Sequence, residues 1–307
     1  MMNSQCTPNL IIVGASKCGT TALYKYLEQN PNFFVPDRKE LHYFSNFHLS
    51  ECSRGPGDAD VLDQVVKTWD DYTAVFQSAA AGQVSVEVSP SYFYFQECAD
   101  IINERILDNT KIVIMLRNPV QKIFSQYVHL VNEGRETESF LDALGLESKR
   151  KLSGYSDMWL YRESGYYFES CKKFIDVFGR SNVKIIWLED FSSNPFSVLD
   201  ELSDFVGIVR PFKYDSLDTV NHIGTPKSLL LAKLIAPNKF SNYVRNHFRY
   251  DWISRLKQRL KKYNAGKREQ LCPDVYHELM RIYAQDLLAL EGLMGSDKGI
   301  PFNYEKN

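Results

Sequence analysis

The chain has 307 residues and a formal net charge of −2, with 24% charged and 44% hydrophobic residues. This composition supports a large buried core and lacks the strong positive charge of proteins that coat nucleic acid, so we expect no nucleic-acid partner. Six scattered cysteines without a C-x-x-C pair, no apolar run of ~20 residues and no signal-peptide pattern predict a cytoplasmic protein with free thiols and no transmembrane segment.

The first predicted element is a buried strand over Leu10–Val13, and a helix is expected over Thr20–Leu27 after a short loop. In that loop, Gly14 and Gly19 have the separation of the nucleotide-binding pattern G-x-x-x-x-G-K-[ST]. The lysine, however, stands inside the loop at Lys17 and not after the second glycine. A strand, a tight turn and a helix present backbone N–H groups to an anion. The segment therefore predicts an anion site with an unusually placed lysine.

Three further strands, rich in β-branched residues, are expected over Val84–Val88, Lys111–Leu116 and Val183–Asp190. Helical patterns alternate with them, one after Pro119 and another over residues 194–208, with Asn194 as N-cap and Pro195 in the first turn. This alternation predicts an α/β, P-loop-like three-layer fold, in which helices flank a central, mostly parallel sheet. We treat residues 1–307 as a single domain with a core at about 9–210.

Two regions depart from this alternation. Residues 46–60 are rich in Gly, Ser and Asp and are predicted to form a loop. Residues 214–268 lack strong strands and become basic, and we expect a helical, basic C-terminal region over about 214–307. Both regions are expected to cover the mouth of the sheet, where open α/β folds bind ligands. The basic stretch is a solvated helix face, a contact for an anionic acceptor or a membrane surface, or part of the nucleotide site.

The end of the strongest strand distinguishes between kinds of nucleotide site. A P-loop ATPase needs an acidic residue near such a strand end to hold Mg²⁺, but this strand stops at Arg117. A guanidinium cannot hold a metal, whereas its planar N–H groups suit a terminal phosphate. Ser125 lies about two turns into the next helix, so that its hydroxyl can return toward the same anion. With Lys17 at the loop, the pattern predicts a nucleotide with two separate phosphate positions and no metal.

At these residues the sequence resembles the sulfotransferases that use 3′-phosphoadenosine 5′-phosphosulfate (PAPS), in particular the heparan-sulfate-type and bacterial carbohydrate enzymes. The matching segments are "GASKCGTT", "KELHYF", "VEVSPSYF" and "RNPVQKIFSQY". The resemblance is good over roughly residues 9–210 and loose beyond.

The resemblance implies roles for individual residues. The 5′-phosphosulfate would be held by Lys17, Cys18, Gly19, Thr20 and Thr21. The 3′-phosphate would be held by Arg117 and Ser125, with Lys267 and Arg268 in a late basic loop closing on it. Lys17 and the N–H groups of the loop would stabilise the departing 5′-phosphate.

The same resemblance makes Glu40 the general base that deprotonates the acceptor hydroxyl, with His42 as the rival base. If this segment is extended, both side chains point the same way. Glu87 is expected to orient Lys17, to touch the acceptor or to form a structural salt bridge. Four tyrosines are candidates for the walls of a sugar-binding mouth or for core packing: Tyr92, Tyr94, Tyr166 and Tyr167.

Two residues depart from the pattern of the family. Lys122 stands where a second arginine is common, which keeps the charge and loses the planar fork. Val88 stands where heparan-type enzymes commonly carry a lysine, which removes a cation from the acceptor side.

The function expected from the sequence is the transfer of a sulfuryl group from PAPS to a hydroxyl of a carbohydrate, a glycoconjugate or a polar small molecule, leaving adenosine 3′,5′-bisphosphate. The partner would be a saccharide or small-molecule acceptor, an anionic one included, and the sequence is compatible with a homo-oligomer. A P-loop kinase or ATPase and a non-catalytic nucleotide-binding protein of the same fold are the alternatives.

Overall fold

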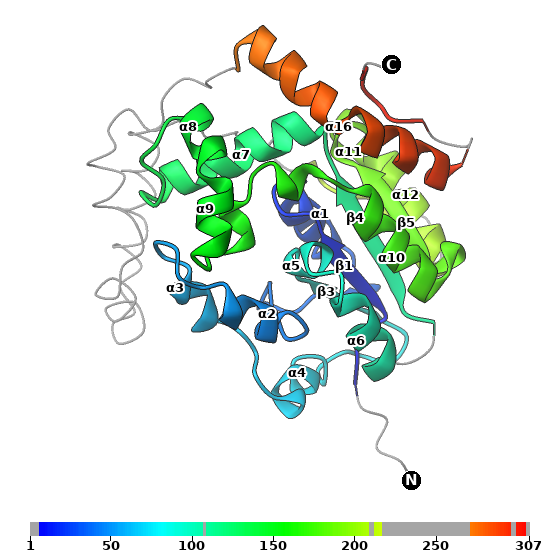
Figure 1. Cartoon of the computed structure of the whole chain (residues 1–307). Helices are drawn as coiled ribbons and strands as arrows, with labels where there is room; N and C mark the ends of the chain where they lie inside the picture. Colours follow the sequence, from blue (N-terminus) through cyan, green and yellow to red (C-terminus); the bar gives the residue numbers. More distant parts are fainter. Residues whose placement is uncertain (1–5, 107–108, 209–211, 217–270, 296–298, 305–307) are drawn as a thin grey trace.

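In the computed structural model, the described residues are 6–106, 109–208, 212–216, 271–295 and 299–304 (Figure 1). The sequence-based expectations for Lys267, Arg268 and most of the 214–268 stretch therefore lie outside the described residues. Within the C-terminal region, Pro273–Met294 forms helix α16.

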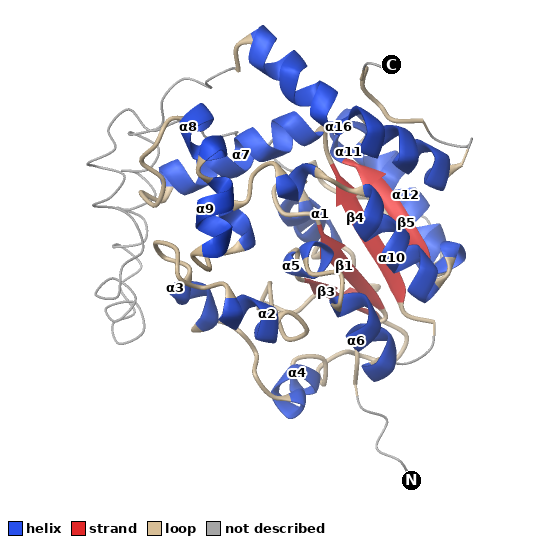
Figure 2. Ribbon diagram, in the orientation of Figure 1, coloured by secondary structure: helices blue, strands red, loops and turns tan. Residues whose placement is uncertain are grey.

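A five-stranded sheet in the order β2-β3-β1-β4-β5 forms the centre of the described structure, and every pairing in it is parallel (Figure 2). Helices flank this sheet, so the predicted fold class is confirmed. The strands are β1 Leu10–Gly14, β2 Phe33–Phe34, β3 Val84–Val88, β4 Lys111–Leu116 and β5 Val183–Trp187.

Two details of the strands differ from the prediction. Strand β2 is two residues long, too short to give a periodic signal, and the sequence did not predict it. The expected strand over Val183–Asp190 ends early at Trp187, because the chain turns at once into helix α11, Leu188–Ser193.

The helices before β4 are α1 Thr20–Leu27, α2 Asn46–Glu51, α3 Ala59–Leu62, α4 Trp69–Ala74, α5 Ser91–Tyr94 and α6 Cys98–Arg105. Those between β4 and α16 are α7 Pro119–Asn132, α8 Phe140–Gly145, α9 Glu147–Leu152, α10 Phe168–Phe178, α11 and α12 Pro195–Val206 among the described residues, with 3₁₀ turns at Asp157–Trp159, Glu163–Gly165 and Arg180–Asn182. The loop predicted over residues 46–60 was wrong in part, since α2 and the start of α3 lie within it.

The predicted helix starts at the two prolines are confirmed. Pro195 is the first residue of α12, and the Asn194 side chain accepts a hydrogen bond from the Ser197 N–H at 3.3 Å. Pro119 begins α7 in the same way, because its missing N–H is not needed in the first turn. The start at Pro119 fixes the point at which α7 leaves the end of β4. It therefore determines which residues of α7 lie next to the site.

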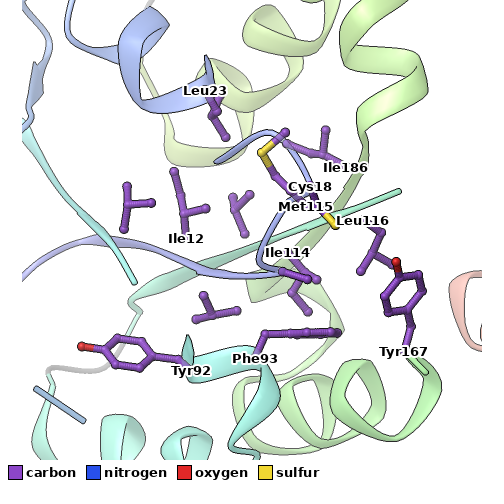
Figure 3. Packing of buried hydrophobic residues seen from close by; sticks show 14 of the residues in the cluster. Ile12, Cys18, Leu23, Tyr92, Phe93, Ile114, Met115, Leu116, Tyr167 and Ile186 are labelled. Atoms are coloured by element: carbon purple, nitrogen blue, oxygen red, sulfur yellow. The ribbon is translucent and has the colours of Figure 1, made fainter. Parts of the chain in front are cut away.

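The core is continuous across the sheet. Ile12 of β1 and Ile114 of β4 are fully buried, as both faces of a parallel sheet require, and Figure 3 shows them in the same hydrophobic cluster as Phe93, Leu116 and Tyr167. The ends of β1 and β4 and the turn between β3 and α5 meet at one edge of the sheet, the edge where such folds bind ligands.

Candidate functional site

The turn between β1 and α1 needs both of its glycines. Gly14 has a φ of 153°, and a Cβ there would lie 2.4 Å from the Cβ of Phe93. Gly19 has a φ of 91°, and its Cβ would lie 2.5 Å from Leu188 Cδ1. Close packing against α5 and α11 therefore explains the glycine spacing, and it holds the turn at the start of α1.

The start of α1 is suited to an anion. Backbone N–H groups in the first turn of a helix have no partner within the helix, and the helix dipole is positive there. Thr20 and Thr21 begin α1, and Lys17 precedes it with a φ of 66°. Cys18 differs, since its N–H donates to the Ala15 carbonyl at 3.2 Å and burial raises the pKa of its thiol to about 11. This geometry favours a supporting role for Cys18 under the loop.

A single cleft of about 1060 Å³ brings most of the sequence-predicted site residues together. Its lining includes Lys17, Gly19, Thr20, Thr21, Glu40, His42, Arg117 and Ser125. These residues come from three separate segments: the β1–α1 turn with the start of α1, the segment before α2, and the end of β4 with helix α7.

Arg117 and Ser125 form one side of this cleft. Arg117 follows the last residue of β4 and is 6% exposed. Its Nη2 donates to Gln121 Oε1 at 3.3 Å, and its carbonyl accepts from the Tyr167 hydroxyl at 2.9 Å. The backbone is thus fixed by a buried tyrosine, while the guanidinium and the hydroxyl of Ser125 line the same cleft. The arrangement is suited to hold an anion between them.

The electrostatics of Lys17 show that the charged groups of the cleft influence one another. Burial lowers the pKa of the Lys17 ammonium, Glu133 and Glu40 raise it, and Arg117 and Lys39 lower it again, for a net decrease. A bound anion would reverse part of this decrease, because an opposite charge favours the ammonium form.

Glu40 and His42 lie close together, although the extended backbone considered in the sequence analysis is not the reason. Their φ values of 62° and 53° are left-handed, so the segment is not extended at these two residues. The His42 Nε2 still lies 3.8 Å from Glu40 Oε2. Because the left-handed conformation is unfavourable for side-chain-bearing residues, contacts from the rest of the fold must hold it.

The two candidate bases differ in environment. Burial raises the pKa of Glu40. The Lys39 ammonium, its hydrogen bond to the carboxylate, and the nearby His42 and His129 lower the pKa by more, so the net shift is downward. Burial lowers the pKa of His42, whose Nδ1 lies 2.8 Å from Ser91 Oγ. The side chain of Glu40 is 44% exposed and that of His42 only 11%. Glu40 is therefore the more accessible to an acceptor.

Lys39 is a residue of the site that sequence reasoning missed. Its Nζ donates to Glu40 Oε1 at 2.8 Å and to Thr21 Oγ1 at 2.9 Å. It thus connects the candidate base to the first turn of α1. The only available signal was its place beside Glu40, and that does not show the contact with Thr21, 18 positions away in sequence.

The structure also places the residues that depart from the family pattern. Lys122 is buried and donates to Gln126 Oε1 at 3.0 Å and to Ser164 Oγ at 2.6 Å, and burial lowers its pKa to about 8. Val88 is buried at the end of β3, and its carbonyl accepts from the Glu40 N–H at 2.9 Å. Neither side chain lines the large cleft.

A second hollow, of about 610 Å³, adjoins the cleft and shares Ser16, Cys52, Pro90 and Asp157 with it. Of the four candidate tyrosines, Tyr94 and Tyr166 line this hollow, whereas Tyr92 and Tyr167 are fully buried in the core. The hydroxyl of Tyr94 donates to Glu163 Oε1 at 2.7 Å.

The fold and the cleft define a P-loop-like α/β protein with a tight, glycine-containing turn between β1 and α1. The family model of the Sulfotransferase domain matches residues 7–282, and the chain belongs to this family. A solved sulfotransferase from Alicyclobacillus acidocaldarius is similar over 95% of this chain and 97% of its own, with 30% identity and a TM-score of 0.75. The resemblance stated from the sequence is therefore confirmed.

Curated relatives are more distant. "Heparan sulfate glucosamine 3-O-sulfotransferase 6" of Mus musculus is 26% identical over 203 residues, which are 66% of this chain and 53% of the relative. "Membrane-associated sulfotransferase kil1" of Dictyostelium discoideum is 24% identical, with 66% and 56% covered. The chain thus spans about half the length of the curated relatives it matches. In the part of the chain that the structure describes, no helix is both long and apolar enough to cross a membrane.

Proposed function

We propose that the protein transfers the sulfuryl group of PAPS to a hydroxyl of a carbohydrate, a glycoconjugate or a polar small molecule. The observation that carries this proposal is the meeting of three parts in one cleft: the start of α1 with Lys17, the pair Arg117 and Ser125, and the carboxylate of Glu40. Together they provide two separate anion positions and a base.

The donor is proposed from the match between these positions and the charges of PAPS. The 5′-phosphosulfate would lie at the N-terminus of α1, against Lys17, Gly19, Thr20 and Thr21. The 3′-phosphate would lie at the end of β4, where Arg117 offers a planar set of N–H donors. ATP has no 3′-phosphate and would leave the second position empty.

In the proposed reaction, Glu40 takes the proton of the acceptor hydroxyl while its oxygen attacks the sulfur. The bond between sulfur and the 5′-phosphate oxygen breaks, and both of its electrons go to that oxygen. Lys17 and the N–H groups of α1 stabilise the negative charge that develops there. The products are the sulfated acceptor and adenosine 3′,5′-bisphosphate, with the proton on Glu40.

The lowered pKa of Glu40 is compatible with this role. Burial raises the pKa of Glu40, and the largest influence that lowers it is the Lys39 ammonium, 2.8 Å from the carboxylate. The negative charges of the donor, bound beside Lys39 and Lys17, would raise the affinity of Glu40 for a proton in the complex. His42 remains the alternative base, but Ser91 and burial hold its ring, whereas Glu40 reaches the open cleft.

For the acceptor, we propose a hydroxyl-rich compound with little negative charge. Several relatives are named as heparan sulfate or carbohydrate sulfotransferases, which supports a saccharide. Tyr94 and Tyr166 in the second hollow offer ring faces for a sugar. Two cations near the acceptor side already have carboxylate partners: Arg135, which lines the large cleft, is paired with Asp58, and Lys151, which lines the second hollow, is paired with Glu163 at 2.6 Å.

The test is a transfer assay with sulfur-labelled PAPS and a panel of neutral and polyanionic saccharides. We expect label in the products, with neutral saccharides preferred. Absence of sulfuryl transfer, together with phosphate transfer from ATP in the same panel, would contradict the proposal and support the kinase alternative.

A further inference from the structure

The segment that carries Glu40 and His42 is attached to β3 and α5 through alternate backbone N–H groups. The N–H of Glu40 donates to the Val88 carbonyl at 2.9 Å. The N–H of His42 donates to Ser89 Oγ at 3.2 Å, and that of Phe44 to the Tyr92 hydroxyl at 3.4 Å. Two of these three attachments therefore depend on side-chain hydroxyls, whose directions are not fixed by the backbone.

Glu87 is the residue that receives both hydroxyls. Its Oε1 accepts from Ser89 Oγ at 3.0 Å and from the Tyr92 hydroxyl at 2.5 Å. Its other oxygen, Oε2, accepts from the hydroxyl of Tyr72 on α4. Glu87 is 2% exposed. The partners seen here are hydroxyls, in place of the Lys17 contact or salt bridge that the sequence suggested.

This arrangement gives each hydroxyl a direction. A hydroxyl has one proton to donate and lone pairs with which to accept. Because Ser89 and Tyr92 donate their protons to Glu87, their lone pairs are left to receive the N–H groups of His42 and Phe44. Without an acceptor at Glu87 Oε1, both hydroxyls would be free to turn and these N–H bonds would weaken.

We propose that Glu87 is a positioning residue for sulfuryl transfer. It orients the hydroxyls of Ser89 and Tyr92, which accept from the N–H groups of His42 and Phe44, and through them it holds the segment that carries Glu40 and His42 at the cleft. This inference rests on the proposed function, because the segment it positions carries the proposed base. Glu87 itself is buried and lines neither the large cleft nor the second hollow.

The structure offers a matched pair of tyrosine substitutions as a test. Tyr92→Phe and Ser89→Ala each remove a hydroxyl that donates to Glu87 Oε1 and also accepts a backbone N–H from the segment that carries Glu40 and His42. Tyr72→Phe removes the hydroxyl that donates to Glu87 Oε2. Among the hydrogen bonds of the described residues, that hydroxyl accepts none from the segment that carries Glu40 and His42. A displacement of about 1 Å at a reacting group costs on the order of a hundredfold in rate.

We therefore expect kcat to fall about tenfold to hundredfold in Ser89→Ala and Tyr92→Phe, with unchanged affinity for adenosine 3′,5′-bisphosphate. Tyr72→Phe should keep kcat within about threefold of the wild type, because Oε1 and its two donors are intact. All rates are compared well below each variant's Tm, so that lower stability alone does not change them.

Two substitutions of Glu87 itself, one conservative and one not, provide a further comparison. Glu87→Gln keeps an oxygen that can accept from Ser89 and Tyr92, so it should retain much more of kcat than Glu87→Ala. An active wild type with equal kcat in Ser89→Ala, Tyr92→Phe and Tyr72→Phe would show that the network serves stability alone and overturn the proposal. A wild type without sulfuryl transfer would instead contradict the proposed function.

Discussion

The buried carboxylate of Glu87 should leave a measurable signature in the dependence of stability on pH. Burial raises its pKa from 4.5 to about 7, and the hydrogen bonds from Tyr72, Tyr92 and Ser89 only partly oppose this increase. Between these two values the folded state binds more protons at this site than the unfolded state. The free energy of unfolding must therefore decrease as the pH rises through this window.

The magnitude follows from the two pKa values. A difference of one pH unit corresponds to about 1.4 kcal/mol, and integration from about pH 5 to about pH 8 gives a loss of about 2.5 kcal/mol from Glu87. Glu87→Gln cannot ionise and lacks this contribution. The stability of the wild type relative to the variant should thus decrease by about 2.5 kcal/mol over the same range, whatever the other groups contribute.

The assay is urea unfolding of both proteins, followed by tryptophan fluorescence at several pH values. Glu136→Gln is a matched control, since Glu136 is also a buried carboxylate that accepts from a tyrosine, but the net shift of its pKa is downward. Its stability difference from the wild type should change little over this range. If the difference in free energy of unfolding between Glu87→Gln and the wild type is also constant over this pH range, the raised pKa of Glu87 is refuted.

Three further outcomes are expected at the cleft. Glu40→Gln should lower kcat by about 10²–10⁴-fold and leave donor affinity nearly intact, and a crippled His42→Ala beside an active Glu40→Gln would mean that His42 is the base. Adenosine 3′,5′-bisphosphate should raise the Tm of the wild type clearly and that of Arg117→Ala much less, whereas ATP with or without Mg²⁺ should have little effect; an equal shift with Mg-ATP would contradict the two-anion site. Transfer should continue in excess chelator, and activity that is lost and then restored by Mg²⁺ would exclude the metal-free mechanism.

Local patterns in the sequence determined most of the fold. The strands β1, β3 and β4 and the helices that begin at Pro119 and Pro195 were predictable, because buried parallel strands and capped helix starts depend on residues close together in the chain. Strand β2 was not, since two residues give no period. The Gly14–Thr21 turn and the order of the motifs also indicated the family.

The contacts within the site depended on the tertiary structure. The sequence named Lys17, Glu40, His42, Arg117 and Ser125, and the fold places all of them on one cleft because the ends of parallel strands meet at one edge of the sheet. The sequence could not show which of them interact, since those contacts join segments far apart in the chain.

The clearest examples are Lys39 and Glu87. Lys39 joins Glu40 to Thr21 across 18 positions, and Glu87 receives the Tyr72 hydroxyl across 15. In the sequence, Glu87 is one acidic residue in a strand, equally compatible with a salt bridge. Its partners follow from the tertiary structure: Glu87 is only 2% exposed, and the hydroxyls of Ser89 after β3, Tyr72 on α4 and Tyr92 on α5 surround its carboxylate. A buried carboxylate must find donors in its surroundings, and the packing of distant elements determines which donors those are.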